Sequence, residues 1–192
     1  MDSRSFWDKT AERYSSRPVA DEASYAATLD IARSYLPDGA SVLELGCGTG
    51  STALRLAGDV GQYLGTDISP RMIEIAAQKA ADVGHIHFQV AQAQDDVGGA
   101  FDAVMAFNLL HLLDNVPEVL AQAHKALKPG SFIMTKSGIM GEGAKHLLRL
   151  PIGLLRLIGK APSVAFHNRA QLDRMFVDAG FEIIRAEMLP AG

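Results

Sequence analysis

Residues 42–50 read VLELGCGTG, an apolar run that passes directly into three glycines at every second position. The run Ser41–Leu45 has the continuous apolar character of a strand that is buried on both faces. Glycines let the backbone adopt conformations that a Cβ would forbid, and a ligand can then approach closely. The helix expected at Ser51–Ala57 would offer free N–H groups to an anionic group. The stretch predicts a nucleotide-like ligand at a helix start, with a tight turn for packing as the alternative.

Short apolar runs alternate with helical stretches on both sides of this loop. The runs expected to be strands are Ser41–Leu45, Tyr63–Thr66, Ile86–Val90, Asp102–Phe107, Ser131–Lys136 and Glu182–Ala186. This alternation predicts an α/β fold with a doubly wound, mainly parallel Rossmann-like sheet and helices on both faces. In such a sheet a ligand binds beyond the carboxyl ends of the strands, where the strand order reverses. The glycine loop follows the first predicted strand and therefore falls where a site is expected.

Capping residues mark the expected helices. The segment up to Tyr35 has helical spacing, and Ser69 with Pro70 would open a helix over Arg71–Asp82. The next two starts are expected at Asn115 with Pro117, in a helix ending at Lys128 before Pro129-Gly130, and at Asn168 with Gln171 as a capping box.

Length and composition indicate one domain without disulfides. The chain has 192 residues, a net charge of −4 and one cysteine, Cys47. We therefore expect no nucleic-acid partner and a reducing compartment. The N-terminal residues MDSRSFWDKTAERYSS lack the apolar core of a signal peptide, and no apolar stretch reaches the ~18–20 residues of a spanning helix. These features predict a cytoplasmic protein without stable membrane insertion.

Two acidic residues narrow the class of ligand that the loop is expected to bind. Glu44 lies just inside the loop, and Asp67 ends the second apolar run. A carboxylate at the end of that strand can accept both hydroxyls of a ribose. A helix-capping role for Asp67 is the alternative, although Ser69 already serves that helix. A dinucleotide fingerprint would place glycine or alanine at position 51, where this chain has Ser51, so the G-x-G-x-G spacing fits NAD less well.

Several motifs in order resemble those of class I S-adenosylmethionine-dependent methyltransferases, particularly the bacterial small-molecule type. The motifs are VLELGCGTG, Asp67, FDAVMAFNLLHLL (101–113) and ALKPGSFIMTKS (126–137). The resemblance covers about Trp7 to Ala186. It implies a single domain over residues 1–192, with an N-terminal helical cap at 1–36 and an inserted helical lid at 138–165.

The resemblance also implies S-adenosylmethionine as the cofactor and assigns contacts to it. The methionine end of the cofactor would contact Gly46, Cys47 and Gly48, together with Glu44. The ribose would be held by Asp67, and the adenine would pack on Ile68. Asn108 would lie near the sulfonium. The stretch Phe88–Gln94 matches the family's third motif, with Gln92 in place of the adenine-binding acid and Ala93 beside it. In WDKTAERYS, Tyr14 would contact the cofactor.

The family's sheet normally continues past a sixth strand to an antiparallel seventh, whereas this sequence stops at Gly192. The seventh strand is therefore either absent, supplied by another chain, or located beyond Gly192. An exposed sheet edge would favour association, which leaves a homodimer open.

Methyl transfer from a sulfonium is an in-line displacement that needs no strong base when donor and acceptor are aligned in a dry pocket. For a phenol or an acidic carbon a base would help, and the candidates are His111, His167 and Tyr14. A structural hydrogen bond for His111 and a surface position for His167 are the alternatives. His85 and His87 lack a third ligand nearby, so no metal is expected. The Cys47 thiol is interpreted as a small filler.

The segment Gly138–Ala165 is strongly apolar with interspersed basic residues. It predicts a core or dimer helix, a lid over a lipophilic or anionic acceptor, or a helix on a membrane surface. The favoured function is methyl transfer to a small organic molecule, with a lipophilic acceptor left open. An NAD-dependent oxidoreductase and a non-catalytic S-adenosylmethionine-binding or interaction domain are the alternatives.

Overall fold

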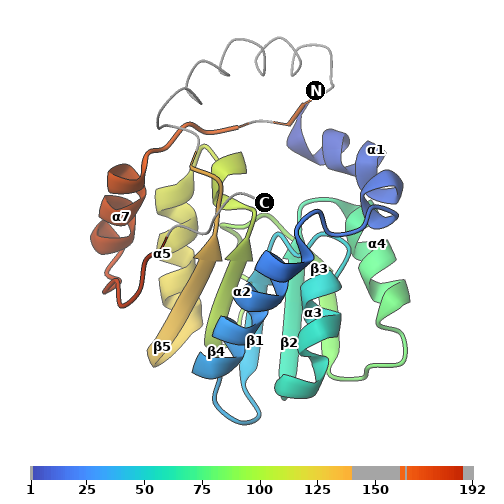
Figure 1. Cartoon of the computed structure of the whole chain (residues 1–192), viewed down its shortest axis with the longest axis horizontal. Coiled ribbons are helices and arrows are strands. Elements are labelled where there is room, and N and C mark those ends of the chain that lie inside the picture. The colour runs from blue at the N-terminus through green and yellow to red at the C-terminus, as the bar shows by residue number, and fades with distance from the viewer. Residues whose placement is uncertain (1, 140–160, 163, 188–192) are drawn as a thin grey trace.

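Five parallel strands form one sheet in the order β3-β2-β1-β4-β5 (Figure 1). This computed structural model describes residues 2–139, 161, 162 and 164–187. The strands are β1 (Ser41–Leu45), β2 (Gln62–Asp67), β3 (Ile86–Val90), β4 (Phe101–Phe107) and β5 (Leu127–Lys136). All neighbouring strands pair in parallel, so the predicted parallel sheet is confirmed.

The helices connect these strands and precede the first of them. They are α1 (Ser3–Ser15), α2 (Glu22–Tyr35), α3 (Ser51–Leu56), α4 (Pro70–Lys79), α5 (Val116–Ala126) and α7 (Arg169–Asp178), with short 3-10 turns η1 (Ala57–Asp59) and η2 (Leu110–Leu112). Two predicted starts are confirmed in atomic detail. Ser69 caps α4 by accepting a hydrogen bond from the Met72 N–H, and Asn168 forms a capping box with Gln171 at α7.

The helix that was predicted to end at Lys128 ends two residues earlier. Helix α5 ends at Ala126, and the chain enters β5 at Leu127. Pro129 and Gly130 therefore lie within the first part of the strand, where Gly130 adopts a positive φ of 77°. Proline is tolerated there because, among the described strands, β5 pairs only with β4 and forms the edge of the sheet.

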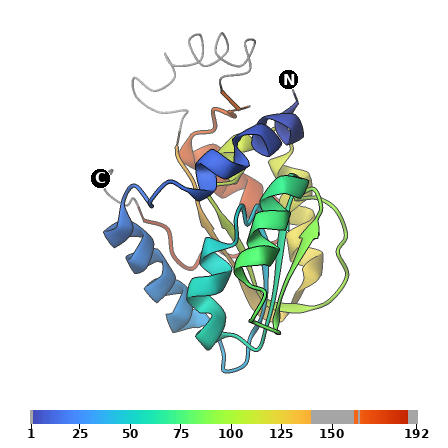
Figure 2. The same cartoon turned by 90° about the vertical axis from the view of Figure 1, so that its right-hand side faces the viewer.

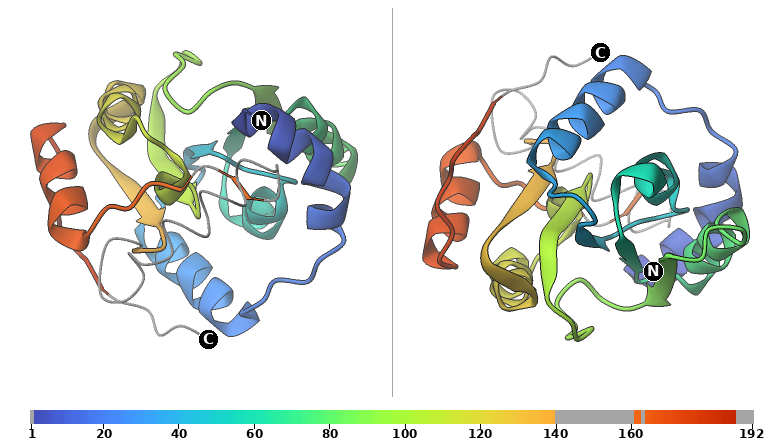
Figure 3. Two further views of the ribbon diagram at one scale, coloured as in Figure 1. Left: turned by 90° about the horizontal axis from the view of Figure 1, so that it is seen from above. Right: turned by 90° about the horizontal axis from the view of Figure 1, so that it is seen from below.

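Helices cover both faces of the sheet, as Figures 2 and 3 show. On one face α2 and α3 bury Leu29, Ala53 and Leu56 against the strands. On the other face α5 and α7 bury Leu120 and Leu172. Strand β4 is buried on both sides because its successive side chains point to opposite faces: Ala103 and Met105 join the first core, Val104 and Ala106 the second.

Helix α1 lies beside α4 (Figures 1 and 2). A small apolar cluster holds the two helices together through Trp7, Ala11, Met72 and Ile75. The Asp8 carboxylate adds polar links, because its Oδ1 accepts hydrogen bonds from Ser69 Oγ at 2.6 Å and from the Arg71 N–H at 3.2 Å. Helix α1 is thereby fixed to the turn that follows β2.

The strand predicted at Glu182–Ala186 is wrong. This segment has no regular secondary structure and pairs with no described strand, and Ile183 and Ile184 are 39% and 68% exposed. An apolar run becomes a strand only where it can pair and bury one face, and neither condition holds here. Within the described part of the chain, the sheet ends at β5.

The central residues of the segment predicted as a lid, 140–160 and 163, lie outside the described residues. Among the helices that the structure does describe, none has the length and apolar character needed to cross a membrane.

Candidate functional site

The glycine loop joins β1 to α3, and all three of its glycines have positive φ: 68° at Gly46, 54° at Gly48 and 77° at Gly50. Packing accounts for the outer two. A Cβ on Gly46 would lie 2.7 Å from Leu109 Cδ1, and one on Gly50 would lie 2.9 Å from Phe88 Cζ. A Cβ on Gly48 would meet only Tyr14, at an ordinary 3.7 Å. The middle glycine is thus the one that packing within the protein does not explain.

Asp67 connects the end of β2 to this loop. Its Oδ2 accepts a hydrogen bond from the Gly48 N–H at 3.0 Å, and its Oδ1 accepts one from the Ser69 N–H at 2.9 Å. Burial raises the pKa of Asp67, and these two backbone donors oppose the rise. A carboxylate has about four acceptor positions, so each oxygen keeps capacity for a further donor such as a ribose hydroxyl.

Glu44 is fully enclosed at the end of β1, with 2% of its surface exposed. Burial raises its pKa to about 7, against hydrogen bonds from Tyr63 and Thr52 that lower it, while the nearby Asp67 charge adds to the rise. Tyr63, on β2, donates its hydroxyl to Glu44 Oε2 at 2.8 Å. The sequence analysis did not predict this partner, although the hydroxyl of a tyrosine within a buried strand usually needs a hydrogen-bond acceptor.

Tyr14 approaches the loop from the last turn of α1. Its ring lies against Gly48 and makes an edge-to-face contact with Trp7, with 6.1 Å between ring centroids. Burial raises the pKa of the Tyr14 hydroxyl, and the Glu44 and Asp67 carboxylates add to the rise. The structure therefore brings Tyr14, Glu44 and Asp67 together around one loop.

Asn108 follows β4, the strand next to β1 where the strand order reverses. It has a φ of 55°, and no other described residue except glycine has a positive φ. Its backbone N–H donates to the Lys136 carbonyl at 2.6 Å, which ties the ends of β4 and β5 together. Left-handed backbone at a non-glycine residue carries strain that often marks a functional position.

The remaining predicted cofactor contacts lie at the ends of β2 and β3. Ile68 is half-buried directly after Asp67, and Ala93 is half-buried beyond β3. Gln92 is exposed, and its backbone N–H donates to Asp95 Oδ2 at 2.8 Å. The loop after β3 thus contains an acid, Asp95, three residues beyond the position at which the family motif places one. The Cys47 thiol is buried close to Gly65, and burial raises its pKa, as expected of a filler.

The candidate bases fall into two groups. His111 lies in η2, beyond β4, and burial lowers its pKa. The His111 carbonyl accepts a hydrogen bond from the Ala165 N–H at 2.8 Å, which brings the segment carrying His167 alongside η2. Tyr14 belongs instead to the glycine loop. His85 lies just before β3 and contacts the Ala57 carbonyl at 2.8 Å, and the described residues contain no group of three potential metal ligands.

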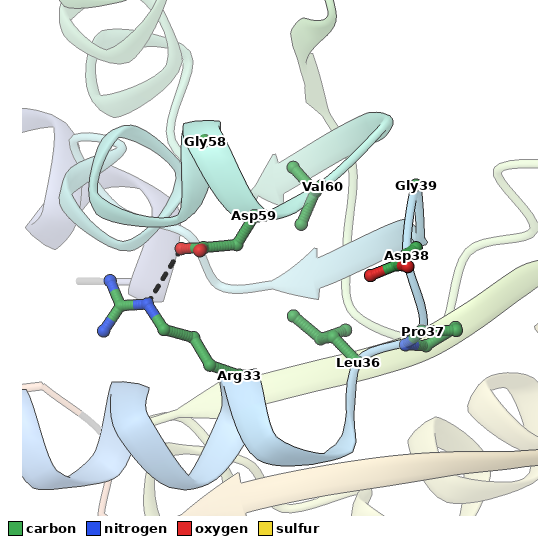
Figure 4. A pocket seen from close by; sticks show the side chains of 8 residues that line it. All are labelled: Arg33, Leu36, Pro37, Asp38, Gly39, Gly58, Asp59 and Val60. Atoms are coloured by element: carbon green, nitrogen blue, oxygen red, sulfur yellow. Dashed lines mark hydrogen bonds and ion pairs between the residues drawn. The ribbon is translucent and has the colours of Figure 1, made fainter.

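A cavity among the described residues lies at the other edge of the sheet (Figure 4). It has a volume of about 300 Å³ and is lined by residues around the starts of β1 and β2. Arg33 and Asp59 form an ion pair across it at 2.8 Å. Because it opens at the amino ends of the strands, it is separate from the loop, Asp67 and Asn108, which all lie at the carboxyl ends. The catalytic chemistry expected of this fold belongs to the carboxyl edge.

Comparison with known proteins agrees with this geometry. Residues 43–133 match a family described as "Methyltransferase domain". The chain is 31% identical over 133 residues to the O-methyltransferase cnsE of Penicillium expansum. The matched region covers 66% of this chain and 47% of that protein. It is 35% identical over 106 residues to the hybrid PKS-NRPS synthetase apdA of Emericella nidulans, covering 50% of this chain and 3% of that one. The chain thus spans at most about half the length of these relatives.

Among solved structures, the [4+2]-cyclase SpnF superposes with a TM-score of 0.72 at 25% identity, covering 88% of this chain and 61% of that one. The comparisons support the interpretation as a methyltransferase and give no support to the NAD-dependent alternative.

Proposed function

We propose that the chain binds S-adenosylmethionine and transfers a methyl group to a small organic molecule, and the match of residues 43–133 to the family described as "Methyltransferase domain" supports this. One observation carries the proposal. Asp67 is hydrogen-bonded to the N–H of Gly48, the one loop glycine whose missing side chain is not explained by internal packing. A ribose acid and a close backbone approach are therefore joined in one rigid unit at the carboxyl edge of the sheet.

The residues around this unit fit the cofactor. We assign the methionine end to the backbone of Gly46, Cys47 and Gly48 with Glu44 behind it, and the ribose to Asp67. Ile68, Gln92 and Ala93 would surround the adenine, Asn108 would lie near the sulfonium, and Tyr14 would cover the loop. The half-buried Ile68 and the ring of Tyr14 against Gly48 support these assignments.

When bound, the cofactor supplies an electrophilic methyl group. The protein has to align the acceptor, exclude water and, for a hydroxyl acceptor, take up a proton. Of the three candidate bases, we favour His111, because its lowered pKa keeps the imidazole neutral and able to accept a proton. Tyr14 has a raised pKa and stays protonated, so we assign it to cofactor contact. His167 lies next to the segment that is bonded to η2 and serves as the second candidate.

The acceptor would be small and lipophilic, enclosed by a helical lid over residues 138–165 within a single domain. The half-buried Leu109 and Leu113 near Asn108 support an apolar acceptor site. The single cysteine of the chain supports a cytoplasmic location. The exposed Val177 and Ile184 support association into a homodimer, which light scattering would detect.

A second candidate is a reaction other than methyl transfer on the same cofactor-binding fold. The likeness to the [4+2]-cyclase SpnF favours this second candidate. A binding domain without catalytic activity would give the same cofactor contacts.

Turnover separates these functions. The protein would be incubated with S-adenosylmethionine and a panel of phenols, enols, amines and carboxylates, and S-adenosylhomocysteine would be measured. Production that depends on one class of acceptor supports methyl transfer. Cofactor binding without S-adenosylhomocysteine production across the panel would favour the second candidate or the non-catalytic domain.

A further inference from the structure

Three buried polar atoms at the carboxyl ends of β4 and β5 have no hydrogen-bond partner among the described residues. They are His111 Nδ1, Ser137 Oγ and His167 Nε2. A buried polar group without a partner costs free energy, and native proteins retain few of them. Three in one region therefore call for a common explanation.

Backbone hydrogen bonds hold the three residues in neighbouring segments. Asn108, three residues before His111, donates to the carbonyl of Lys136, directly before Ser137. Ala165, two residues before His167, donates to the His111 carbonyl at 2.8 Å. The end of β5, the turn η2 and the approach to α7 thus meet beside Asn108, at the end of the sheet that also carries the glycine loop.

Among the described residues, the basic side chain next to this group in the sequence is that of Lys136. The Lys136 ammonium donates to Ser24 Oγ at 2.8 Å and Thr28 Oγ1 at 3.2 Å, so it is committed to α2. Leu109, Leu113 and Ile139 pack in the same region. Burial lowers the pKa of His111, which favours its neutral form.

We propose that His111, Ser137 and His167 form a polar cluster that binds the methyl acceptor through a hydroxyl group, as in a phenol or an enol. A neutral imidazole has one nitrogen that accepts and one that donates, and a serine hydroxyl does both. A ligand hydroxyl, which also donates and accepts, satisfies such a cluster, whereas a carboxylate only accepts and would leave an accepting imidazole nitrogen without a donor. This inference rests on the proposed methyltransferase function and names its acceptor class.

The first arm of the test measures stability without any acceptor. In Ser137→Ala the melting temperature should equal or exceed that of the wild type, because no internal hydrogen bond is lost. Ser69→Ala is the matched control: its hydroxyl donates to Asp8 and caps α4, so the variant should melt several degrees lower. An equal loss of melting temperature in Ser137→Ala would overturn the proposal, because Ser137 would then have a structural partner.

The second arm measures binding of 2-naphthol and 2-methoxynaphthalene to the full chain saturated with S-adenosylhomocysteine. The free hydroxyl should bind about tenfold more tightly than the methylated one, and Ser137→Ala or His111→Phe should reduce that ratio several-fold. Equal affinities, or tighter binding of 2-naphthoate, would overturn the proposal. S-adenosylhomocysteine binding is measured separately in each variant. Its absence in the wild type would contradict the proposed function, while the stability arm would still report on the cluster.

Discussion

Tyr63 donates its hydroxyl to Oε2 of Glu44 at 2.8 Å, and both side chains are buried at the base of the glycine loop. The two residues lie on neighbouring strands, β2 and β1, and Tyr63 pairs with Val42 in the register of the sheet. A carboxyl group in an enclosed position is tolerated only when donors satisfy it. This contact therefore links the stability of the sheet to the charge of a residue in the proposed cofactor site.

Tyr63→Phe should destabilise the protein by about 1–3 kcal/mol, because Glu44 loses a buried donor. The loss should be larger at pH 8 than at pH 5, since the ionised carboxylate needs the donor more than the protonated form does. Urea unfolding at the two pH values measures it. Tyr35→Phe, at a tyrosine that is 41% exposed, is the control and should change the free energy of unfolding by less than about 0.5 kcal/mol. A Tyr63→Phe variant as stable as the control would contradict the assigned role of the contact.

The raised pKa of Glu44 predicts a pH dependence of stability. In the unfolded chain Glu44 loses its proton near its ordinary value of 4.5, and in the folded protein it does so at about 7. Between these two pH values the folded state holds a proton on Glu44 that the unfolded state has released. The stabilisation of the folded state by this proton is therefore complete below pH 4.5 and is lost as the pH rises through about 7.

Glu44→Gln should therefore flatten the decline in stability between pH 5 and pH 8, by about 3 kcal/mol at most. Asp67, whose pKa is raised in the same direction, would account for slope that remains. Glu118→Gln, at an exposed position on α5, should leave the profile as in the wild type. A Glu44→Gln profile that parallels the wild type would exclude Glu44 as the titrating group.

The elements that sequence reasoning predicted well are those specified by local signals. Strands β1 and β3 have the predicted bounds, because short runs rich in apolar residues are followed there by a glycine loop or a polar loop. The caps at Ser69 and Asn168 depend on residues within three positions of each other. The glycine spacing likewise predicted, from neighbouring residues alone, a loop whose backbone favours glycine.

What could not be predicted depends on contacts between distant segments. The apolar run at Glu182–Ala186 has the composition of a strand but no partner in the described sheet. The pairing of Tyr63 with Glu44 and the unpartnered atoms of His111 and Ser137 depend on side-chain directions that a sequence pattern does not specify. Tertiary packing decides such features.

Substitutions at two of the loop glycines and at one control position separate ligand binding from packing. Gly50→Ala should lower stability most, because a Cβ would lie 2.9 Å from Phe88 and 3.0 Å from Ala76 Cβ. Gly48→Ala should cost only about 1–2 kcal/mol of backbone strain, and its main effect should be loss of cofactor affinity. Gly58→Ala, with nothing within 4 Å of its Cβ, should behave as the wild type. Thermal melts and cofactor titrations measure both effects, and unchanged affinity in Gly48→Ala would remove the loop from the site.

His111→Gln should lower kcat for a hydroxyl acceptor by on the order of 10²–10⁴, because the proposed base is lost. The cofactor Kd should stay the same, since His111 lies beyond β4 and outside the glycine loop. His87→Gln, on the exposed side of β3, is the control and should retain full activity. A kcat within threefold of the wild type would leave His111 with a structural role.

Titration calorimetry of the full chain with S-adenosylmethionine, S-adenosylhomocysteine and NAD tests the central claim most directly. Both adenosyl compounds should bind with micromolar Kd, and Asp67→Asn should weaken them at least tenfold, whereas Asp59→Asn, at the opposite edge of the sheet, should not. Binding of NAD alone, or S-adenosylmethionine affinity that Asp67→Asn leaves unchanged, would contradict the account.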